Sequence, residues 1–231
     1  MSNAATAIEN LRMHELFKPG NTGAWEFLSR FDFLWEALPK IGEFIEELAE
    51  SLDKSEYEQI GSAAWAHRTA SIAATAHIGS GIIIGAETEV RHCAYLRGPA
   101  LIGKGAVVGN STELKNVILF DGVQVPHFNY VGDSILGHKA HMGAGSITSN
   151  VKSDSSLVSV IFGAERIETG LKKFGAILGD SVEIGCNSVL NPGAIIGAES
   201  TIYPLSSVRG YIPPRSIYKR ESEIVEKMLR E

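Results

Sequence analysis

The chain has 231 residues, of which 44% are hydrophobic and 21% are charged, and its formal net charge is -6. This length suits one extended domain with an appendage, and the composition excludes an intrinsically disordered chain. The acidic balance and the lack of a basic run argue against a nucleic-acid partner. The N-terminus shows no basic segment followed by an apolar core, and no apolar run is long enough to span a bilayer. We therefore expect a cytoplasmic protein with no membrane partner.

Residues 1–59 are predicted to form a helical region. Apolar residues between Phe27 and Leu52 recur in steps of four and three, which lines one face of a helix. Because Pro39 cannot lie inside that helix, we expect two helices, the second beginning near Pro39. A coiled coil is the alternative, but the apolar stripe is short and interrupted. The pattern favours helices that pack on the open end of the domain that follows.

Residues 60–212 carry a six-residue repeat. An aliphatic residue recurs at every sixth position from Ile60 to Val208, most clearly at Ile78, Ile84, Val90, Leu96, Ile102, Val108 and Leu114, and again at Leu178, Ile184, Leu190, Ile196, Ile202 and Val208. In a helix such residues would point in three directions, whereas in extended chain an even spacing lets them all point inward. The fold that stacks such units is a parallel β-helix with three six-residue sides per coil. A sandwich of short strands and a right-handed solenoid are the alternatives.

The repeat is interrupted twice and then ends. It runs through Phe120 and resumes in a shifted register at Tyr130, Leu136 and Met142. The second interruption, residues 151–173, predicts an inserted loop or hairpin, and long loops in a regular solenoid are usually functional. The Pro213-Pro214 pair is predicted to end the coils, and residues 213–231 are predicted to form a short helical tail.

Polar segments stand within the repeats at fixed intervals. They are Leu96-Arg97, residues 109–115 (GNSTELK), residues 127–133 (HFNYVGD) and residues 142–150 (MGAGSITSN). The repeat resembles the left-handed β-helix hexapeptide-repeat acyltransferases. These segments most strongly resemble the acetyltransferase domain of the bifunctional UDP-N-acetylglucosamine pyrophosphorylase/glucosamine-1-phosphate N-acetyltransferases, whose pattern runs LRP, GNFVE(M/V)K, HL(T/S)Y(L/I)GD and (N/D)IGAGTITCNY. Residues 162–177 are similar to the archaeal-type branch. The Gly-rich nucleotide loop of the pyrophosphorylase domain is absent from the sequence.

The resemblance implies a mainly β protein, a left-handed parallel β-helix that transfers an acetyl group from acetyl-CoA to an amino sugar phosphate. Glucosamine 1-phosphate is the default acceptor, in UDP-N-acetylglucosamine or related nucleotide-sugar synthesis. His127 would be the general base, which suits the ordinary pKa of histidine. The implied acceptor ligands are Arg97, Lys115, Tyr130, His141, Asn150 and Lys173, and the residues lining acetyl-CoA are Ala144, Cys186 and Pro204. A homotrimer with sites between neighbouring solenoids is implied, and no metal is expected.

Three departures from the family pattern leave other functions open. His141 stands where the family usually has Asn, Val151 replaces a Tyr, and Pro126 replaces a Gly. A different amino sugar, or a non-catalytic or regulatory β-helix trimer, would also fit these changes. A metal-dependent hydratase of the γ-carbonic-anhydrase type would need three histidines at an interface, but the spacing of His138 and His141 does not match that family.

Overall fold

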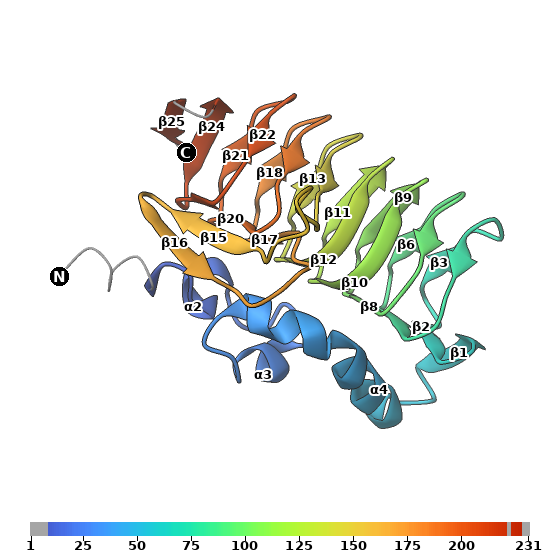
Figure 1. Ribbon diagram of the computed structural model, residues 1–231. Helices are drawn as coiled ribbons and strands as arrows, with labels where there is room; N and C mark the ends of the chain where they lie inside the picture. The colour runs from blue at the N-terminus through green and yellow to red at the C-terminus, as the bar shows by residue number, and fades with distance from the viewer. Residues whose placement is uncertain (1–8, 221–222, 228–231) are drawn as a thin grey trace.

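The computed structural model describes residues 9–220 and 223–227, and most of them form a parallel β-solenoid (Figure 1). The mainly β fold predicted from the six-residue repeat is confirmed. Each coil contributes a short strand to each of three faces, so that strands far apart in sequence stack as rungs. Together the three faces enclose the core.

The three faces of the solenoid are the Tyr130 face, the helix-covered face and the β11 face. The Tyr130 face consists of β4 (His77–Ile78), β7 (Tyr95–Leu96), the first halves of β10 (Glu113–Leu119) and β12 (Tyr130–Leu136), β14 (Ile147–Thr148), β19 (Val189–Leu190) and β22 (Ser207–Val208). The helix-covered face consists of β2 (Ala64–His67), β5 (Ile82–Ile84), β8 (Ala100–Ile102), the second halves of β10 and β12, β17 (Ala176–Leu178), β20 (Ala194–Ile196) and β23 (Tyr211–Ile212). The β11 face consists of β3 (Ser71–Ile72), β6 (Glu89–Val90), β9 (Val107–Asn110), β11 (Gln124–His127), β13 (His141–Met142), β18 (Glu183–Ile184), β21 (Thr201–Ile202) and β24 (Ser216–Arg220).

The repeat residues point inward and stack on one another. Leu96 pairs with Leu114, and Leu114 pairs with Val131; all three side chains are fully buried. Burial of one aliphatic side chain stabilises the fold by roughly 1.5 to 3 kcal/mol, so the column supplies a continuous core. Ile60 does not belong to this column, because it lies exposed in β1 (Tyr57–Gly61), which pairs with β2 in the antiparallel direction. The solenoid therefore begins at β2.

The change of register occurs earlier than the sequence indicated. Tyr95 pairs with Glu113 one coil later, but Glu113 pairs with Tyr130 after a coil that is one residue shorter. The missing residue falls at the corner of Asn116. The next coil is shortened in the same way at Asp133. Val131, rather than Tyr130, is thus the inward residue, and the prediction that Tyr130 belongs to the buried repeat was wrong.

The N-terminal helices lie along one side of the solenoid (Figure 1). They are α2 (Met13–Leu16), α3 (Trp25–Leu28), the 3-10 helix η1 (Leu34–Lys40) and α4 (Ile41–Ser51). Pro39 lies in η1 just before α4 begins, so the break was predicted but the number of helices was not. The expected packing on the open end was wrong. Ile41 and Ile45 of α4 are buried, and α4 packs against β5, β8 and β10 of the helix-covered face.

The outward side chains of the helix-covered face explain this packing. Strands β5 and β8 are buried at all three positions, because Ile83 and Leu101 point outward beneath the helices. A strand that is buried on both sides is apolar throughout, whereas a strand with one side in water alternates. No helix among the described residues is long and apolar enough to cross a membrane.

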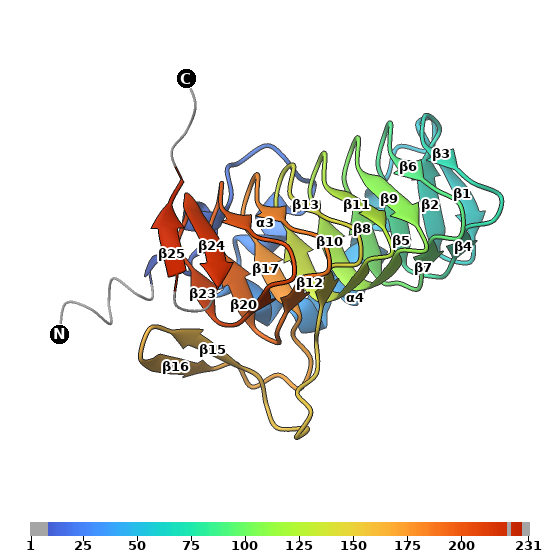
Figure 2. The ribbon, with the colours of Figure 1, turned by 90° about the horizontal axis from the view of Figure 1, so that it is seen from above.

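The insertion and the C-terminal segment form two further hairpins. Strands β15 (Ser159–Phe162) and β16 (Glu165–Glu168) pair antiparallel and stand beside the coils (Figure 2). Phe162 stacks on Tyr211 at 4.6 Å between ring centroids, which ties this hairpin to the last coils. Within the described part of residues 213–231 the predicted helix was wrong, since β24 continues the β11 face and pairs antiparallel with β25 (Glu223–Glu226); residues 221–222 and 228–231 lie outside the described residues. The Pro213-Pro214 pair forms a corner of the coil, where no ladder hydrogen bond is needed, rather than its end.

Candidate functional site

Two edges of the prism border the Tyr130 face, and the predicted site residues fall mainly on them. The edge shared with the helix-covered face, here called the aspartate edge, carries Arg97, Lys115, Asp133 and Asn150 at corners between strands. The edge shared with the β11 face, here called the imidazole edge, carries His127, Ala144, Cys186 and Pro204. The Tyr130 face therefore separates the predicted phosphate ligands from the predicted base.

Asp133 is the centre of the aspartate edge. Its side chain is only 5% exposed, and both of its carboxylate oxygens accept a hydrogen bond from Lys115 Nζ at 2.9 Å. Asn116 Nδ2 donates to Oδ1 at 2.9 Å, and Asn150 Nδ2 donates to Oδ2. A buried carboxylate is tolerated when it is paired and hydrogen-bonded in this way.

The shortened coils create this cluster. Asn116 and Asp133 are the corner residues of the two shortened coils, with φ values of 56° and 47°. Asn and Asp enter the left-handed region at less cost than other residues with a Cβ. Because the two corners stack directly, the side chains of Lys115 and Asn116 meet the carboxylate of Asp133 in the next coil.

Tyr130 lies on the outer side of its face next to this cluster. It pairs with Glu113 on one side and with Ile147 on the other. Burial, with the nearby negative charge of Asp133, raises the pKa of the half-buried Tyr130 hydroxyl. A Cβ on Gly132 would come within 2.5 Å of the Tyr130 hydroxyl oxygen, so only a glycine leaves room for this ring position. The phenol is consequently protonated near neutral pH and available as a hydrogen-bond donor.

Two more predicted cations stand near the aspartate edge. Arg97 is exposed, and its guanidinium is 3.2 Å from the Glu113 carboxylate. Lys173 is exposed and precedes the buried Phe174, whose backbone N–H donates to the Asn150 carbonyl at 3.0 Å. The segment that leads from the insertion back to the coils is therefore anchored at Asn150. This hydrogen bond brings Lys173 beside the same corner.

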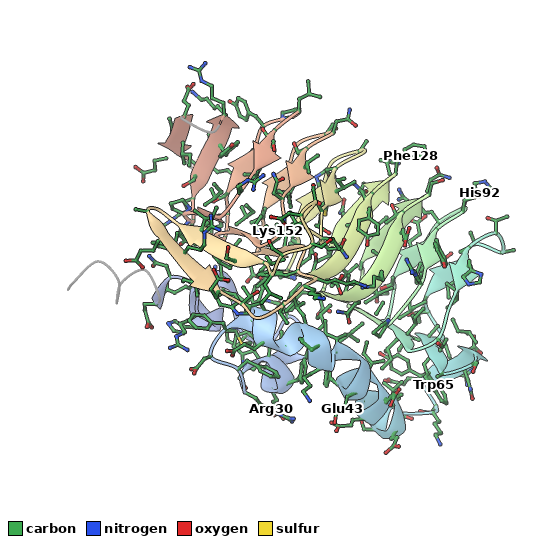
Figure 3. All side chains as sticks on the ribbon, viewed as in Figure 1. Arg30, Glu43, Trp65, His92, Phe128 and Lys152 are labelled. Carbon is green, nitrogen blue, oxygen red and sulfur yellow. The ribbon has the colours of Figure 1, made fainter. Side chains whose placement is uncertain are left out.

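His127 ends β11 at the imidazole edge and is exposed. Its carbonyl accepts a hydrogen bond from Gly145 N at 3.0 Å, which holds the backbone to the next coil. Among the described residues, the His127 ring has no hydrogen-bond partner. The next residue, Phe128, is 63% exposed with a φ of 51°, and Figure 3 shows it at the tip of a corner on the same edge as His92. One chain thus presents an imidazole and an aromatic ring to the outside.

The three residues predicted to line acetyl-CoA form a column along the same edge. Asn187 N donates to the Ala144 carbonyl at 2.8 Å, so the corner that holds Cys186 stacks under Ala144. Leu205 N donates to the Cys186 carbonyl at 2.9 Å, which puts Pro204 in the corner below. Cys186 is an exposed free thiol and Leu205 is 80% exposed. The column that begins at His127 therefore offers an apolar outer surface.

His141 lies on neither edge. It begins β13 between Gln124 and Glu183, and its Nδ1 is 2.8 Å from the Glu183 carboxylate. This hydrogen bond raises the pKa of His141, against a smaller opposing effect of burial. Within one chain, His141 forms a surface ion pair away from the Asp133 cluster.

The histidines of one chain do not assemble a metal site among the described residues. His138 Nδ1 is hydrogen-bonded to the Asp121 carbonyl at 2.7 Å, and His92 contacts Thr75 and Cys93. Both of these rings therefore have local partners, and the described residues give the hydratase interpretation no support.

Sequence reasoning missed the residues that hold the predicted ligands in position. Asp133 was part of a recognised segment but received no role, and Asn116 was not singled out. The available signal was the pair Lys115-Asn116 standing one coil before Gly132-Asp133. That signal becomes informative only when both coils are known to be one residue short.

Comparison with known proteins gives partial relatives. No protein-family model matches the chain. The chain is 38% identical over 90 residues to a bifunctional sugar-1-phosphate nucleotidylyltransferase/acetyltransferase of Sulfurisphaera tokodaii, which covers 39% of this chain and 22% of that protein. It is 35% identical over 113 residues to the bifunctional protein GlmU of Methanococcus aeolicus, which covers 48% of this chain and 27% of that protein. The matched stretch thus spans about a quarter of the length of these curated relatives.

Among solved structures, the chain is similar to a hexapeptide transferase family protein from Anaplasma phagocytophilum. The TM-score is 0.42 at 18% sequence identity, over 74% of this chain and 82% of that one. The strand pairing, rather than this likeness, establishes the solenoid. The sequence matches confirm the resemblance to bifunctional nucleotidylyltransferase/acetyltransferases over part of the chain.

Proposed function

We propose that the protein is an acetyl-CoA-dependent N-acetyltransferase whose acceptor is an amino sugar phosphate, with glucosamine 1-phosphate as the default. One observation carries this proposal: the ordered Lys115 ammonium, with Arg97 on the same edge, and an exposed imidazole border the same face of the solenoid from opposite edges. A phosphorylated amino sugar lying across that face could meet cations at one end and a base at the other. The relatives named as acetyltransferases support the same reaction class.

In the proposed reaction, His127 takes a proton from the sugar amine as the amine attacks the thioester carbonyl of acetyl-CoA. An amide bond forms, the thioester bond breaks, and CoA leaves as its thiol. Lys115 and Arg97 bind the phosphate, Arg97 as a planar fork and Lys115 as a point charge. Tyr130 and Asn150 orient the sugar. The backbone N–H of Ala144 would stabilise the developing oxyanion, and Cys186 and Pro204 would line the CoA chain.

A homotrimer is part of this proposal. The His127 ring has no partner among the residues described, and Phe128 and Leu205 expose apolar surface on the same edge. A second copy of the chain lying against this edge would cover that surface and complete a cleft. Lys173 and His141 would then serve a site to which more than one chain contributes.

A thiol-release assay tests the reaction. Purified protein with acetyl-CoA and glucosamine 1-phosphate should release CoA, and His127→Ala should lower the rate by about 100-fold to 10,000-fold. His14→Ala is the matched control, because His14 is an exposed histidine on α2 away from both edges. Acetyl-CoA binding without CoA release, across a panel of amino sugar phosphates, would instead favour a non-catalytic solenoid.

A mixing experiment tests whether sites are shared. His127→Ala chains and Lys173→Ala chains, each inactive alone, should recover activity when they are unfolded together and refolded as mixed oligomers. Recovery is expected because some mixed sites would hold an intact His127 and an intact Lys173 from different chains. An unchanged low rate after mixing would mean that each chain is self-contained.

A further inference from the structure

We infer that Asp133 is a positioning residue that holds Lys115 and Asn150 as one preformed phosphate-binding group beside Tyr130. This inference rests on the proposed function, and it assigns a role to a residue that would not itself touch the substrate. It is carried by the hydrogen bonds around the carboxylate, by its burial, and by the elements that fix its backbone.

The donors around Asp133 account for its whole hydrogen-bonding capacity. Its two oxygens accept two hydrogen bonds from Lys115, one from Asn116 and one from Asn150. A carboxylate has about four lone-pair sites, so none is left to face a ligand. With only 5% of its side chain exposed, the negative charge lies behind its donors and would not confront a phosphate directly.

The side chains around Asp133 differ in whether they keep an N–H or O–H donor free for a ligand. Asn116 Nδ2 donates to Asp133 and also to the Leu38 carbonyl at 3.1 Å, so both of its N–H groups are used. Lys115 has three N–H donors and uses two of them on Asp133, which leaves one for an anion. Burial and the nearby charge of Asp133 raise the pKa of Tyr130, so its hydroxyl retains a proton to donate. Lys115 and Tyr130 therefore supply the free donors, and Asn116 supplies none.

Elements outside the coils fix the position of the carboxylate. The Leu38 carbonyl belongs to η1, which reaches the edge through Asn116. Gly175 N donates to the Asp133 carbonyl at 2.8 Å, from the return of the insertion. The cluster is thus held from the N-terminal helices, from the coils and from the insertion, so the ammonium group is oriented before any ligand arrives. Such preorganisation is what a binding site needs if binding energy is not to be spent on ordering its own side chains.

Asp133→Asn tests this role against the control Asp180→Asn. Asp180 is a second buried corner carboxylate, on the edge opposite the Tyr130 face, where it accepts backbone hydrogen bonds from Lys18 and His138 at 2.8 Å. Calorimetric titration with inorganic phosphate should show affinity reduced by about tenfold or more in Asp133→Asn. The affinity of Asp180→Asn should stay within about twofold of the unsubstituted protein. In steady-state assays, the KM for glucosamine 1-phosphate should rise in Asp133→Asn while the KM for acetyl-CoA does not change.

Asn116→Gly keeps the test decisive if Asp133→Asn fails to fold. Glycine accepts the positive φ of this corner, and Asn116 has no free donor for phosphate. A severalfold loss of phosphate affinity in this variant would therefore act through Asp133. Loss of the Asp133 charge should also lower the pKa of Tyr130, measured by ultraviolet titration against Tyr130→Phe. That shift reports the loss of the charge, and the KM for glucosamine 1-phosphate against that for acetyl-CoA separates positioning from stability.

The outcomes separate this inference from the proposed function. Unchanged phosphate affinity in Asp133→Asn and Asn116→Gly, or an equal loss in Asp180→Asn, overturns the role of Asp133 even if CoA is released. Phosphate binding that depends on Asp133, without CoA release from glucosamine 1-phosphate, supports the inference and overturns the proposed acceptor. Absence of phosphate binding in the unsubstituted protein overturns the preformed group.

Discussion

The aspartate edge and the imidazole edge border one face but differ in how much of their chemistry one chain completes. At the aspartate edge Lys115 pairs with Asp133 and Arg97 pairs with Glu113 within the chain. At the imidazole edge the His127 ring lacks a partner among the described residues, and Phe128 is largely exposed. One chain therefore orders the polar groups of the aspartate edge by itself, whereas the imidazole edge leaves the His127 ring and an apolar column exposed.

The two edges also differ in what supports them. Elements beyond the coils brace the aspartate edge, through Leu38 of η1 and through Gly175 after the insertion. The imidazole edge is made of coil corners, joined by backbone hydrogen bonds such as Gly145 to His127. Substitutions at the first edge should therefore change stability, whereas many at the second should change activity or assembly with little effect on stability.

Lys115→Met should have the largest effect on stability. It leaves the Asp133 carboxylate buried without its cation, which should cost about 3 kcal/mol or more in the free energy of unfolding, measured by urea denaturation. His127→Ala, at the other edge, should change that free energy by no more than about 0.5 kcal/mol. The double variant Lys115→Met with Asp133→Asn should be less destabilised than the sum of the two single variants, because no unpaired charge remains. Additive effects would show that Lys115 and Asp133 are not coupled.

Gly109→Ala should have the next largest effect, and it tests the backbone of the imidazole edge. A Cβ on Gly109 would overlap the carbonyl of Pro126, which directly precedes His127. Because backbone must move to relieve this overlap, we expect a loss of about 2 to 3 kcal/mol together with a displaced His127. Gly23→Ala is the control, since its Cβ would meet no atom within 4 Å. Equal melting temperatures for the two variants would contradict the close approach of β9 and β11.

The sequence predicted the solenoid because its signal is periodic and local. It did not predict that the helices lie along a side, although the helix-covered strands Ile82–Ile84 and Ala100–Ile102 are apolar at consecutive positions. The Tyr130 face, by contrast, alternates, as in Tyr95-Leu96. Consecutive apolar residues in a short strand indicate burial on both sides, and that difference could have shown which face is covered.

For the candidate site, the sequence offered candidate ligands but not the residues that support them. The resemblance supplied His127, Lys115 and Asn150, each from a linear motif. The role of Asp133 depends on two coils that are each one residue short, and a six-residue count cannot locate that deletion when Phe120 is also buried. The prediction of a C-terminal helix was wrong for a related reason. Paired prolines usually end repeats, but here they occupy a corner that needs no N–H donor.

Phe128→Asn should have a smaller effect, in the stabilising direction. A bulky residue with a φ of 51° is strained, and asparagine tolerates this conformation better. Because the ring is 63% exposed, its removal loses little burial, so the free energy of unfolding should rise by up to about 1 kcal/mol. If Phe128 is kept for contacts with another chain, the same variant should sediment as smaller species. A clear loss of stability in a protein of unchanged size would mean that the ring packs within its own chain.

Glu183→Gln should have the smallest effect, and one that depends on pH. The hydrogen bond to Glu183 raises the pKa of His141 in the folded protein, so the pair stabilises the fold most below about pH 6.5, the ordinary pKa of histidine. That contribution is lost as pH rises through the folded-state pKa. Both side chains are about a third or more exposed, so the difference should stay below about 1 kcal/mol near pH 5 and vanish near pH 9.

Glu43→Gln is the matched control for this pH dependence. Glu43 pairs with Lys40, whose charge does not change over the same range, so its small effect should be flat. Thermal melts of both variants from about pH 5 to about pH 9 make the comparison. A Glu183→Gln effect that persists at the alkaline end would show that neutral His141 also needs this partner. Such a result would fit the role of acceptor ligand that the resemblance implies for His141.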